Sequence, residues 1–112
     1  SDVTRVEAPA GPLFAAIRQA AITTDEESQG IDFAFSEGTL TLAAEAAQTG
    51  ASHVELPIAF SGEPITICLN HKFLGQFFRV LNPESNVSIE LQSAESAAVF
   101  STEDGYRYVL MP

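Results

Sequence analysis

Strict alternation of apolar and polar residues is the clearest pattern in the sequence. Apolar residues occupy alternate positions in 31–35 and again in 40–42, on either side of Glu37-Gly38. A period of two puts successive side chains on opposite faces of a strand, and a short connection containing glycine joins two such strands. The pattern therefore predicts a β-hairpin.

The same period predicts six further strands. It is weak in residues 3–8, clear in 54–60 and 65–69, and returns in the segments NVSIELQ, SAAVFS and YRYVLM. Pro57 cannot donate a ladder hydrogen bond, so its strand is expected to lie at a sheet edge or to carry a bulge. Cys68 falls out of phase with the apolar positions of its own strand.

Two segments follow a helical period instead. GPLFAAIRQAAI opens with Gly11-Pro12, which predicts a cap followed by proline at the first helical position. NHKFLGQFFRVL opens with Asn70 as a good N-cap and ends before Asn82-Pro83. Their apolar stripes are formed by Leu13, Phe14, Ile17 and Ala21, and by Leu74, Phe77, Phe78 and Leu81. The acidic residues 25–27 predict a loop after the first helix.

The predicted elements repeat once along the chain. Strand, helix and three strands are followed by strand, helix and three strands, which indicates two βαβββ units. We expect an α+β fold in which the strands form one antiparallel layer and both helices pack on one face of it. Arg18, Lys72 and Arg79 would then point outward from the same helical side.

Composition favours one globular domain over residues 1–112. Hydrophobic residues make up 46% and charged residues 18% of the 112 positions. No apolar run is long enough to cross a membrane and no leader is evident, so we expect no membrane partner. The single cysteine, Cys68, fits a reducing cytoplasm.

The distribution of charge differs from its total. The net charge is −10, yet none of the fifteen acids lies in 11–22 or 70–81, which hold three of the five basic residues. One interpretation is that two short amphipathic helices lack acids by chance. The other is a local positive surface on an acidic body.

The chain ends on YRYVLMP, without a charge in its last five side chains. In a strand, Tyr106, Tyr108 and Leu110 would line one face, and Val109 and Met111 the other. Only one face can join the core, so the other apolar side chains should be covered by something else. A neighbouring loop or a binding partner could cover them.

These elements, in this order, resemble the β sliding clamp, the processivity subunit of bacterial DNA polymerase III. The resemblance runs from Val3 to Pro112 and rests on LFAAIRQAAITTDEESQGIDFAF, LPIAFSGEPITICLNHKFLGQFFRVL and YRYVLMP. It implies the DNA-clamp fold and the C-terminal, third domain of a longer subunit. Two such subunits close into a homodimeric ring, with helices lining the hole.

The resemblance also implies roles for individual residues. Arg18, Lys72 and Arg79 would face duplex DNA through contacts that read no sequence. Ile22 and Thr23, with the edge strand 53–58, would meet the other subunit. A groove for peptides of the form Gln-Leu-x-Leu-Phe would be walled by Asn70, Phe73, Val109, Met111 and Pro112. The DNA polymerase III catalytic subunit, the clamp loader and other proteins with this motif would be the partners.

Two positions depart from the usual family pattern. Phe73 stands where the groove commonly has tyrosine, and so lacks the hydroxyl. Glu95 stands where one groove wall is often apolar. Phe73 keeps the aromatic ring of the usual residue, and Glu95 would reshape one side of the groove.

Other classes of function find little support in the sequence. His53 and His71 lie far apart in no metal or nucleophile motif, and no Gly-rich phosphate loop is present. We therefore expect a non-catalytic protein without cofactor or metal, and a solvated His71. The alternative to a clamp is a free-standing peptide-binding module unrelated to DNA.

Overall fold

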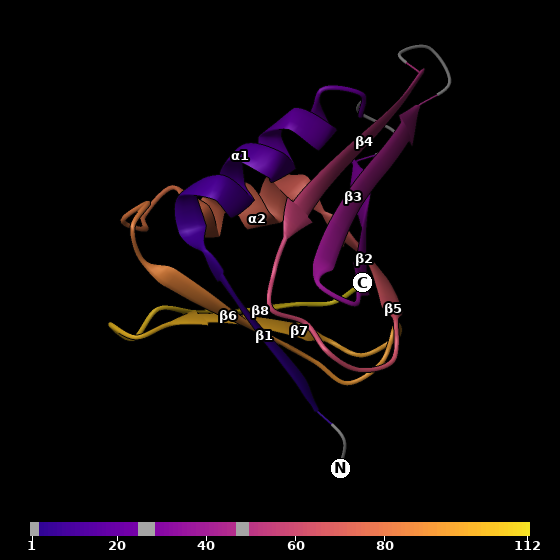
Figure 1. Cartoon of the computed structure of the whole chain (residues 1–112). Coiled ribbons are helices and arrows are strands. Elements are labelled where there is room, and N and C mark those ends of the chain that lie inside the picture. Colours follow the sequence, from indigo (N-terminus) through magenta and orange to yellow (C-terminus); the bar gives the residue numbers. More distant parts are fainter. Residues whose placement is uncertain (1–2, 25–28, 47–49) are drawn as a thin grey trace.

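The computed structural model describes residues 3–24, 29–46 and 50–112, so the loop predicted at 25–27 lies outside the described residues. Within them the chain forms eight strands and two helices (Figure 1). In chain order they are β1 (Thr4–Pro9), α1 (Ala10–Ala21), β2 (Gly30–Ser36), β3 (Thr39–Ala46), β4 (Gly50–Pro57), β5 (Ile65–Asn70), α2 (His71–Phe78), β6 (Asn86–Leu91), β7 (Ala98–Thr102) and β8 (Arg107–Leu110). The predicted order of elements is confirmed.

The strands form two antiparallel sheets of four strands each, in the orders β1-β6-β7-β8 and β4-β3-β2-β5. The expectation of a single layer is therefore wrong. The first strand of each βαβββ unit joins the other unit's sheet: β1 pairs with β6, and β5 pairs with β2. The two units are thereby interlocked, and neither sheet is complete without both.

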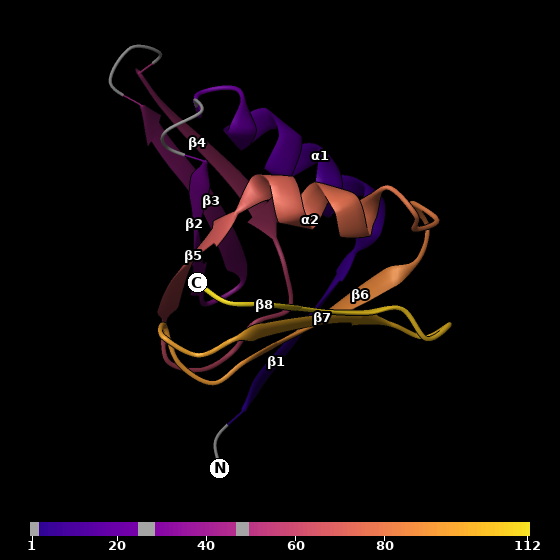
Figure 2. The same cartoon turned by 180° about the vertical axis from the view of Figure 1, so that it is seen from behind.

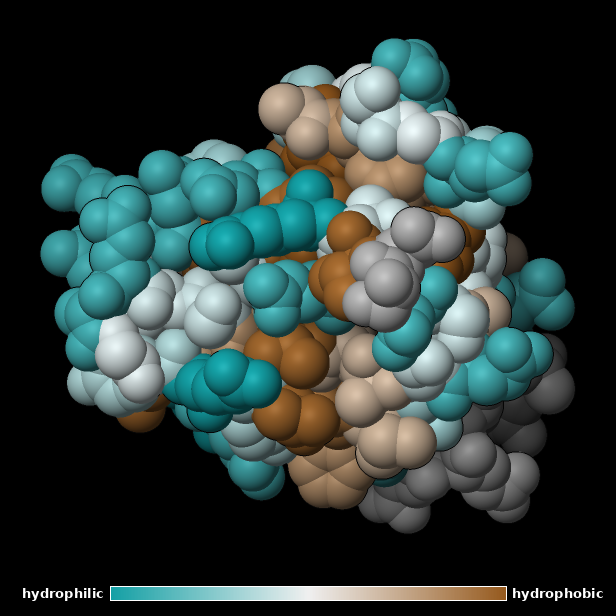
Figure 3. All heavy atoms as spheres, turned by 90° about the horizontal axis from the view of Figure 1, so that it is seen from below, coloured by the Kyte–Doolittle hydropathy of each residue, from teal (hydrophilic) through white to brown (hydrophobic). Residues whose placement is uncertain are grey.

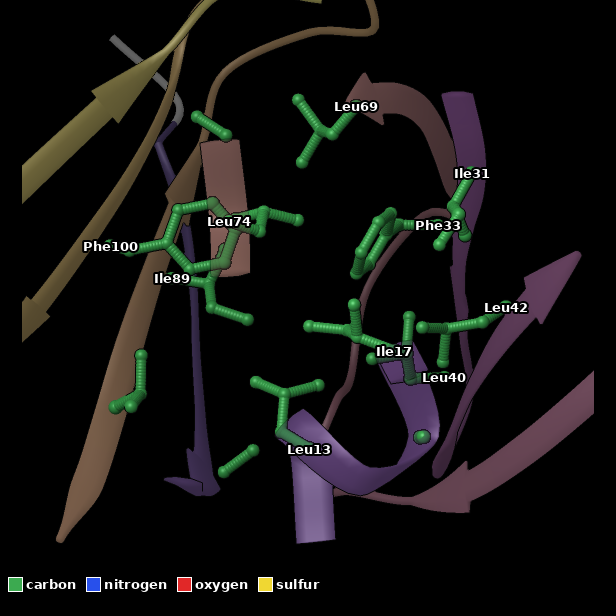
Figure 4. Close-up of a cluster of buried hydrophobic side chains, with 14 of the residues drawn as sticks. Leu13, Ile17, Ile31, Phe33, Leu40, Leu42, Leu69, Leu74, Ile89 and Phe100 are labelled. Atoms are coloured by element: carbon green, nitrogen blue, oxygen red, sulfur yellow. The ribbon is translucent and has the colours of Figure 1, made fainter. Parts of the chain in front are cut away.

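The helices lie side by side in the angle between the two sheets (Figures 1 and 2). Leu13 and Ile17 of α1 and Leu74 of α2 are buried between Phe33 on one sheet and Phe100 on the other (Figure 4). Burying apolar side chains from all three layers in one core is the main stabilising contribution. It leaves the opposite faces of both helices free of the core.

Helix α1 begins earlier than Gly11-Pro12 predicted. Its N-cap is Pro9, which supplies no side-chain cap. The first two helical N–H groups instead donate to the carbonyls of Ser85 at 2.8 Å and Pro83 at 2.9 Å. This close approach favours glycine, because a Cβ on Gly11 would lie 3.1 Å from the Pro83 oxygen, a tighter contact than most side chains make. The helix start is thus fixed by a segment far away in the sequence.

Helix α2 begins as predicted, because Asn70 Oδ1 accepts a hydrogen bond from the Lys72 backbone N–H at 2.8 Å. It ends at Phe78, three residues before Leu81, which still packs against the core. Strand β4 lies at a sheet edge, as Pro57 predicted. In the described part of the chain, neither helix is long and apolar enough to cross a membrane.

Candidate functional site

A groove of about 610 Å³ runs between the free faces of the two helices. The groove is lined by all three basic residues that were predicted to lie on one helical side. They come from two segments more than fifty residues apart. Its full lining is Phe14, Ile17, Arg18, Ala21, His71, Lys72, Gly75, Gln76 and Arg79. No carboxylate is among these lining residues, so the groove concentrates positive charge on a chain whose net charge is −10.

Ring stacking positions the cation from α1. The Arg18 guanidinium carbon lies 5.6 Å from the centroid of the Phe14 ring, a cation–π contact. Phe14 in turn stacks on Phe78 of α2, with centroids 5.5 Å apart and planes inclined by 13°. Lys72 in the first turn of α2 and Arg79, the C-cap residue of the same helix, complete the positive face. The stack therefore links the two helices and aims Arg18 into the groove.

His71 belongs to the same groove, a position that the sequence pattern did not predict. Its Nε2 lies 3.0 Å from the Thr24 hydroxyl oxygen. Burial, and secondarily the neighbouring Lys72, lower the pKa of His71, which favours the neutral imidazole. The sequence feature that could have indicated this position is that His71 stands next to Lys72 in a segment without acidic residues.

The chain end has the two faces that its alternation predicted. Val109 is 54% exposed and Met111 is 64% exposed, whereas Leu110 between them is buried. Tyr108, like Leu110, faces inward and stacks on Phe77 of α2, with ring centroids 5.6 Å apart. The expectation for Tyr106 is wrong, because this residue precedes β8 and is 45% exposed.

The structure brings the chain end toward the start of α2. Strand β8 and helix α2 run in opposite directions, and the chain end lies beside β5 and the beginning of α2 in both views (Figures 1 and 2). From the Tyr108–Phe77 contact, Met111 and Phe73 therefore extend the same way. Phe73 is 46% exposed. Exposed apolar side chains thus lie both at the end of β8 and in the first turn of α2.

Asn70 is already occupied by local hydrogen bonds. Besides capping α2, its side-chain amide donates to Gln29 Oε1 at 3.3 Å.

Glu95 lies in the turn between β6 and β7, where its N–H donates to Ser93 Oγ at 3.3 Å. On the underside of the molecule, where the β1-β6-β7-β8 sheet lies, patches of apolar surface alternate with hydrophilic side chains (Figure 3).

Ile22 and Thr23 lie directly after α1 and beside the edge strand β4. Ile22 is 75% exposed. The Thr23 hydroxyl contacts the Ser52 hydroxyl at 2.9 Å, and Ser52 Oγ donates to the Ala20 carbonyl at 3.0 Å. These bonds join the end of α1 to β4, so the structure brings together the two parts of the predicted subunit interface.

Comparison with known proteins identifies the family. Residues 2–112 match the family model described as the DNA polymerase III beta subunit, C-terminal domain. The chain belongs to this family. It is 29% identical over 102 residues to the beta sliding clamp of Chlamydia muridarum and 28% identical over 104 residues to that of Synechococcus elongatus.

Solved structures agree on the fold. The DNA polymerase III subunit beta of Pseudomonas aeruginosa has a TM-score of 0.90 and 26% identity, and covers 99% of this chain. The corresponding subunit of Thermotoga maritima has a TM-score of 0.88 at 21% identity over 97% of this chain. The predicted α+β DNA-clamp fold is confirmed. The similarity to the Chlamydia and Synechococcus clamps spans 89% of this chain but only 27% and 28% of their own lengths.

Proposed function

We propose that this chain is the C-terminal, third domain of a ring-shaped DNA sliding clamp that tethers the replicative polymerase to duplex DNA. The observation that carries the proposal is the groove between α1 and α2. In a domain of the clamp family, it gathers Arg18, Lys72 and Arg79 on one face without an acid among its lining residues. The helix face would line the ring's hole and the sheets its outside.

The groove suits a contact that slides along DNA. Its cations can reach phosphates, which repeat along any duplex and carry no sequence information. Arginine donates in a planar fork that matches phosphate oxygens, and lysine acts as a compact charge. An acidic exterior with net charge −10 would repel DNA from every other face. Such a protein needs no catalytic group, and we infer that it is a non-catalytic processivity factor.

The chain end would supply part of a second surface, which binds partner peptides. Val109, Met111 and Phe73 offer exposed apolar side chains, and their burial against a leucine or phenylalanine of a bound peptide would stabilise the complex. Methionine adapts to differently shaped partners, which suits a groove shared by several proteins. The partners would be the polymerase III catalytic subunit, the clamp loader and other proteins with the Gln-Leu-x-Leu-Phe motif.

Ring closure would use the surface around Ile22 and β4. An exposed isoleucine beside an unpaired strand edge offers apolar burial together with backbone hydrogen bonds for another subunit. We infer a homodimer of longer subunits, working in the cytoplasm. A single domain with three groove cations would bind duplex DNA only weakly.

The DNA contact can be tested with a matched pair of variants. Removing the groove cations by Arg18→Gln, Lys72→Gln and Arg79→Gln should weaken binding to two unrelated duplexes at low ionic strength, measured by fluorescence anisotropy. The salt dependence of log K should become shallower by about 0.9 for each DNA phosphate that the variant no longer neutralises. The control, Arg5→Gln with Arg107→Gln, removes the chain's other two cations. Equal weakening by both sets would contradict a groove-specific contact.

A further inference from the structure

Two short contacts of Thr24 determine which nitrogen of His71 carries a proton. The Thr24 hydroxyl oxygen lies 2.7 Å from the Ala21 carbonyl oxygen. A carbonyl only accepts, so the single hydroxyl hydrogen must point at Ala21. Toward His71 Nε2, at 3.0 Å, the same oxygen can then only accept. The imidazole therefore carries its proton on Nε2.

This tautomer limits what neutral His71 can do in the groove. With Nε2–H donated to Thr24, Nδ1 holds only a lone pair, and a lone pair does not bind phosphate oxygen. Within the described residues, Nδ1 has no hydrogen-bond partner. On protonation, Nδ1 gains a hydrogen and becomes a donor with a positive charge. A single proton thus converts this position from one that repels phosphate to one that binds it.

We propose that His71 is a proton-linked phosphate contact, whose imidazolium donates Nδ1–H to a DNA phosphate held by the groove cations. The inference rests on the proposed function, because it takes duplex DNA as the groove's ligand. Phosphate favours the charged form of His71, so DNA and protons bind cooperatively. DNA affinity should therefore rise as the pH falls through the pKa of His71.

The surroundings of His71 set the range over which this link operates. Lys72 adjoins it on α2, and Arg18 and Arg79 share the groove. Burial and Lys72 lower the pKa in the free protein, so the ring is mostly neutral at neutral pH. Thr24 approaches from the end of α1 and Gln29, whose carbonyl accepts the His71 backbone N–H at 3.1 Å, from the start of β2. The acids Asp25, Glu26 and Glu27 lie outside the described residues.

The experiment uses the chain's two histidines, of which His53 lies on the far edge strand and serves as an internal control. Imidazole resonances are titrated by NMR at low ionic strength, with and without a short DNA duplex, and assigned through His71→Gln and His53→Gln. Nitrogen shifts of the free protein should show the Nε2–H tautomer for His71. Saturating duplex should raise the pKa of His71 by about one unit, which corresponds to tenfold tighter binding to the protonated form. His53 should shift less.

The outcomes separate this inference from the function on which it rests. If the duplex perturbs the groove and its binding depends on Arg18 and Arg79, but the pKa of His71 does not move, His71 is no phosphate contact and the DNA surface stands. An Nδ1–H tautomer would overturn the inference without any ligand. If the duplex leaves the groove unperturbed, the proposed function fails first. His71→Gln should abolish the tightening at low pH, whereas His53→Gln should retain it.

Discussion

The ring of Tyr108 stacks on the ring of Phe77, with centroids 5.6 Å apart and planes inclined by 18°. This contact joins the last strand to the second helix, and it decides which side chains of β8 face inward. Because successive residues of a strand alternate, Val109 must point away from α2. In the apolar chain end, Tyr108 thus anchors β8 to α2, whereas Val109 and Met111 remain exposed.

Replacing the anchor should cost much stability. Tyr108→Ala removes a partly buried ring and its stacking contact with Phe77, so we expect a loss of about 2–4 kcal/mol in the free energy of unfolding. Val109→Ala is the matched control, because its side chain is 54% exposed. It should cost less than about 1 kcal/mol. Urea melts of both variants provide the measurement, and similar losses would mean that β8 is not anchored through Tyr108.

Met111 should matter more for peptide binding than for folding. Because it is 64% exposed, Met111→Ala should lower the free energy of unfolding by about 1 kcal/mol or less. Burial of this side chain by a peptide's leucine or phenylalanine should make the same change cost about 1–2 kcal/mol of affinity. Fluorescence titration of a Gln-Leu-x-Leu-Phe peptide into a full-length clamp carrying this domain measures the affinity.

Phe73→Ala is an independent check on the same groove, because Phe73 starts from α2 rather than from β8. It should weaken the same peptide, whereas Val80→Ala, an exposed aliphatic residue just beyond α2, should not. A Met111→Ala variant that is much less stable in urea melts, yet binds the peptide with unchanged affinity under conditions where it is still folded, would place the chain end in the core and refute the groove.

Ile22→Ala should loosen the ring in a full-length clamp. Its side chain is 75% exposed here, so the change should scarcely affect the stability of this chain. In a ring it would remove apolar burial at the contact between subunits. Analytical ultracentrifugation at low protein concentration should show more dissociated subunit than for the unaltered clamp or for Val80→Ala. An unchanged dimer would remove Ile22 from the interface.

Cys68 should react slowly for an exposed thiol. Burial, then the charge of Asp32 and a hydrogen bond with it, raise the pKa of Cys68; the two residues are direct cross-strand partners. The pKa of Cys68 in the folded state lies above the ordinary thiol pKa. The contribution of the neutral thiol to folding stability is therefore fully present when the pH is below the ordinary pKa. It is lost as the pH rises through the folded-state pKa.

Asp32→Asn should therefore speed the reaction of Cys68 with a disulfide reagent at mildly alkaline pH, by about threefold or more, since the thiolate is the reacting form. Glu55→Gln, a carboxylate on the edge strand of the same sheet, should not. A rate unchanged by Asp32→Asn would leave burial as the sole cause of the raised pKa.

Local sequence patterns predicted the type and order of the helices and strands. Contacts between residues far apart in the sequence determined where α1 begins and how the strands pair. The period of two located the hairpin around Gly38, whose φ of 71° is the conformation that glycine allows. The Asn70 cap located the start of α2, because its partner is only two residues away. By contrast, the carbonyls of Pro83 and Ser85 determine where α1 starts, and no local signal reveals them.

The division into two sheets was missed for the same reason. Alternation identifies a strand but not its neighbour, and β1 pairs with β6 across more than seventy residues. The groove was partly predictable, since Arg18, Lys72 and Arg79 stand in segments without acids. The role of His71 depends on Thr24, forty-seven positions away. Side-chain chemistry that depends on folding could not be read from either segment alone.

The central claim is that one small domain presents two separate surfaces, one to DNA and one to partner peptides. Mapping of backbone amide NMR shifts tests it directly, with duplex DNA and the Gln-Leu-x-Leu-Phe peptide added separately. We expect DNA to shift residues of the α1–α2 groove around Arg18 and Arg79, and the peptide to shift residues around Phe73 and 109–112. Shifts from DNA on the outer strands, or a single surface that responds to both ligands, would contradict the claim.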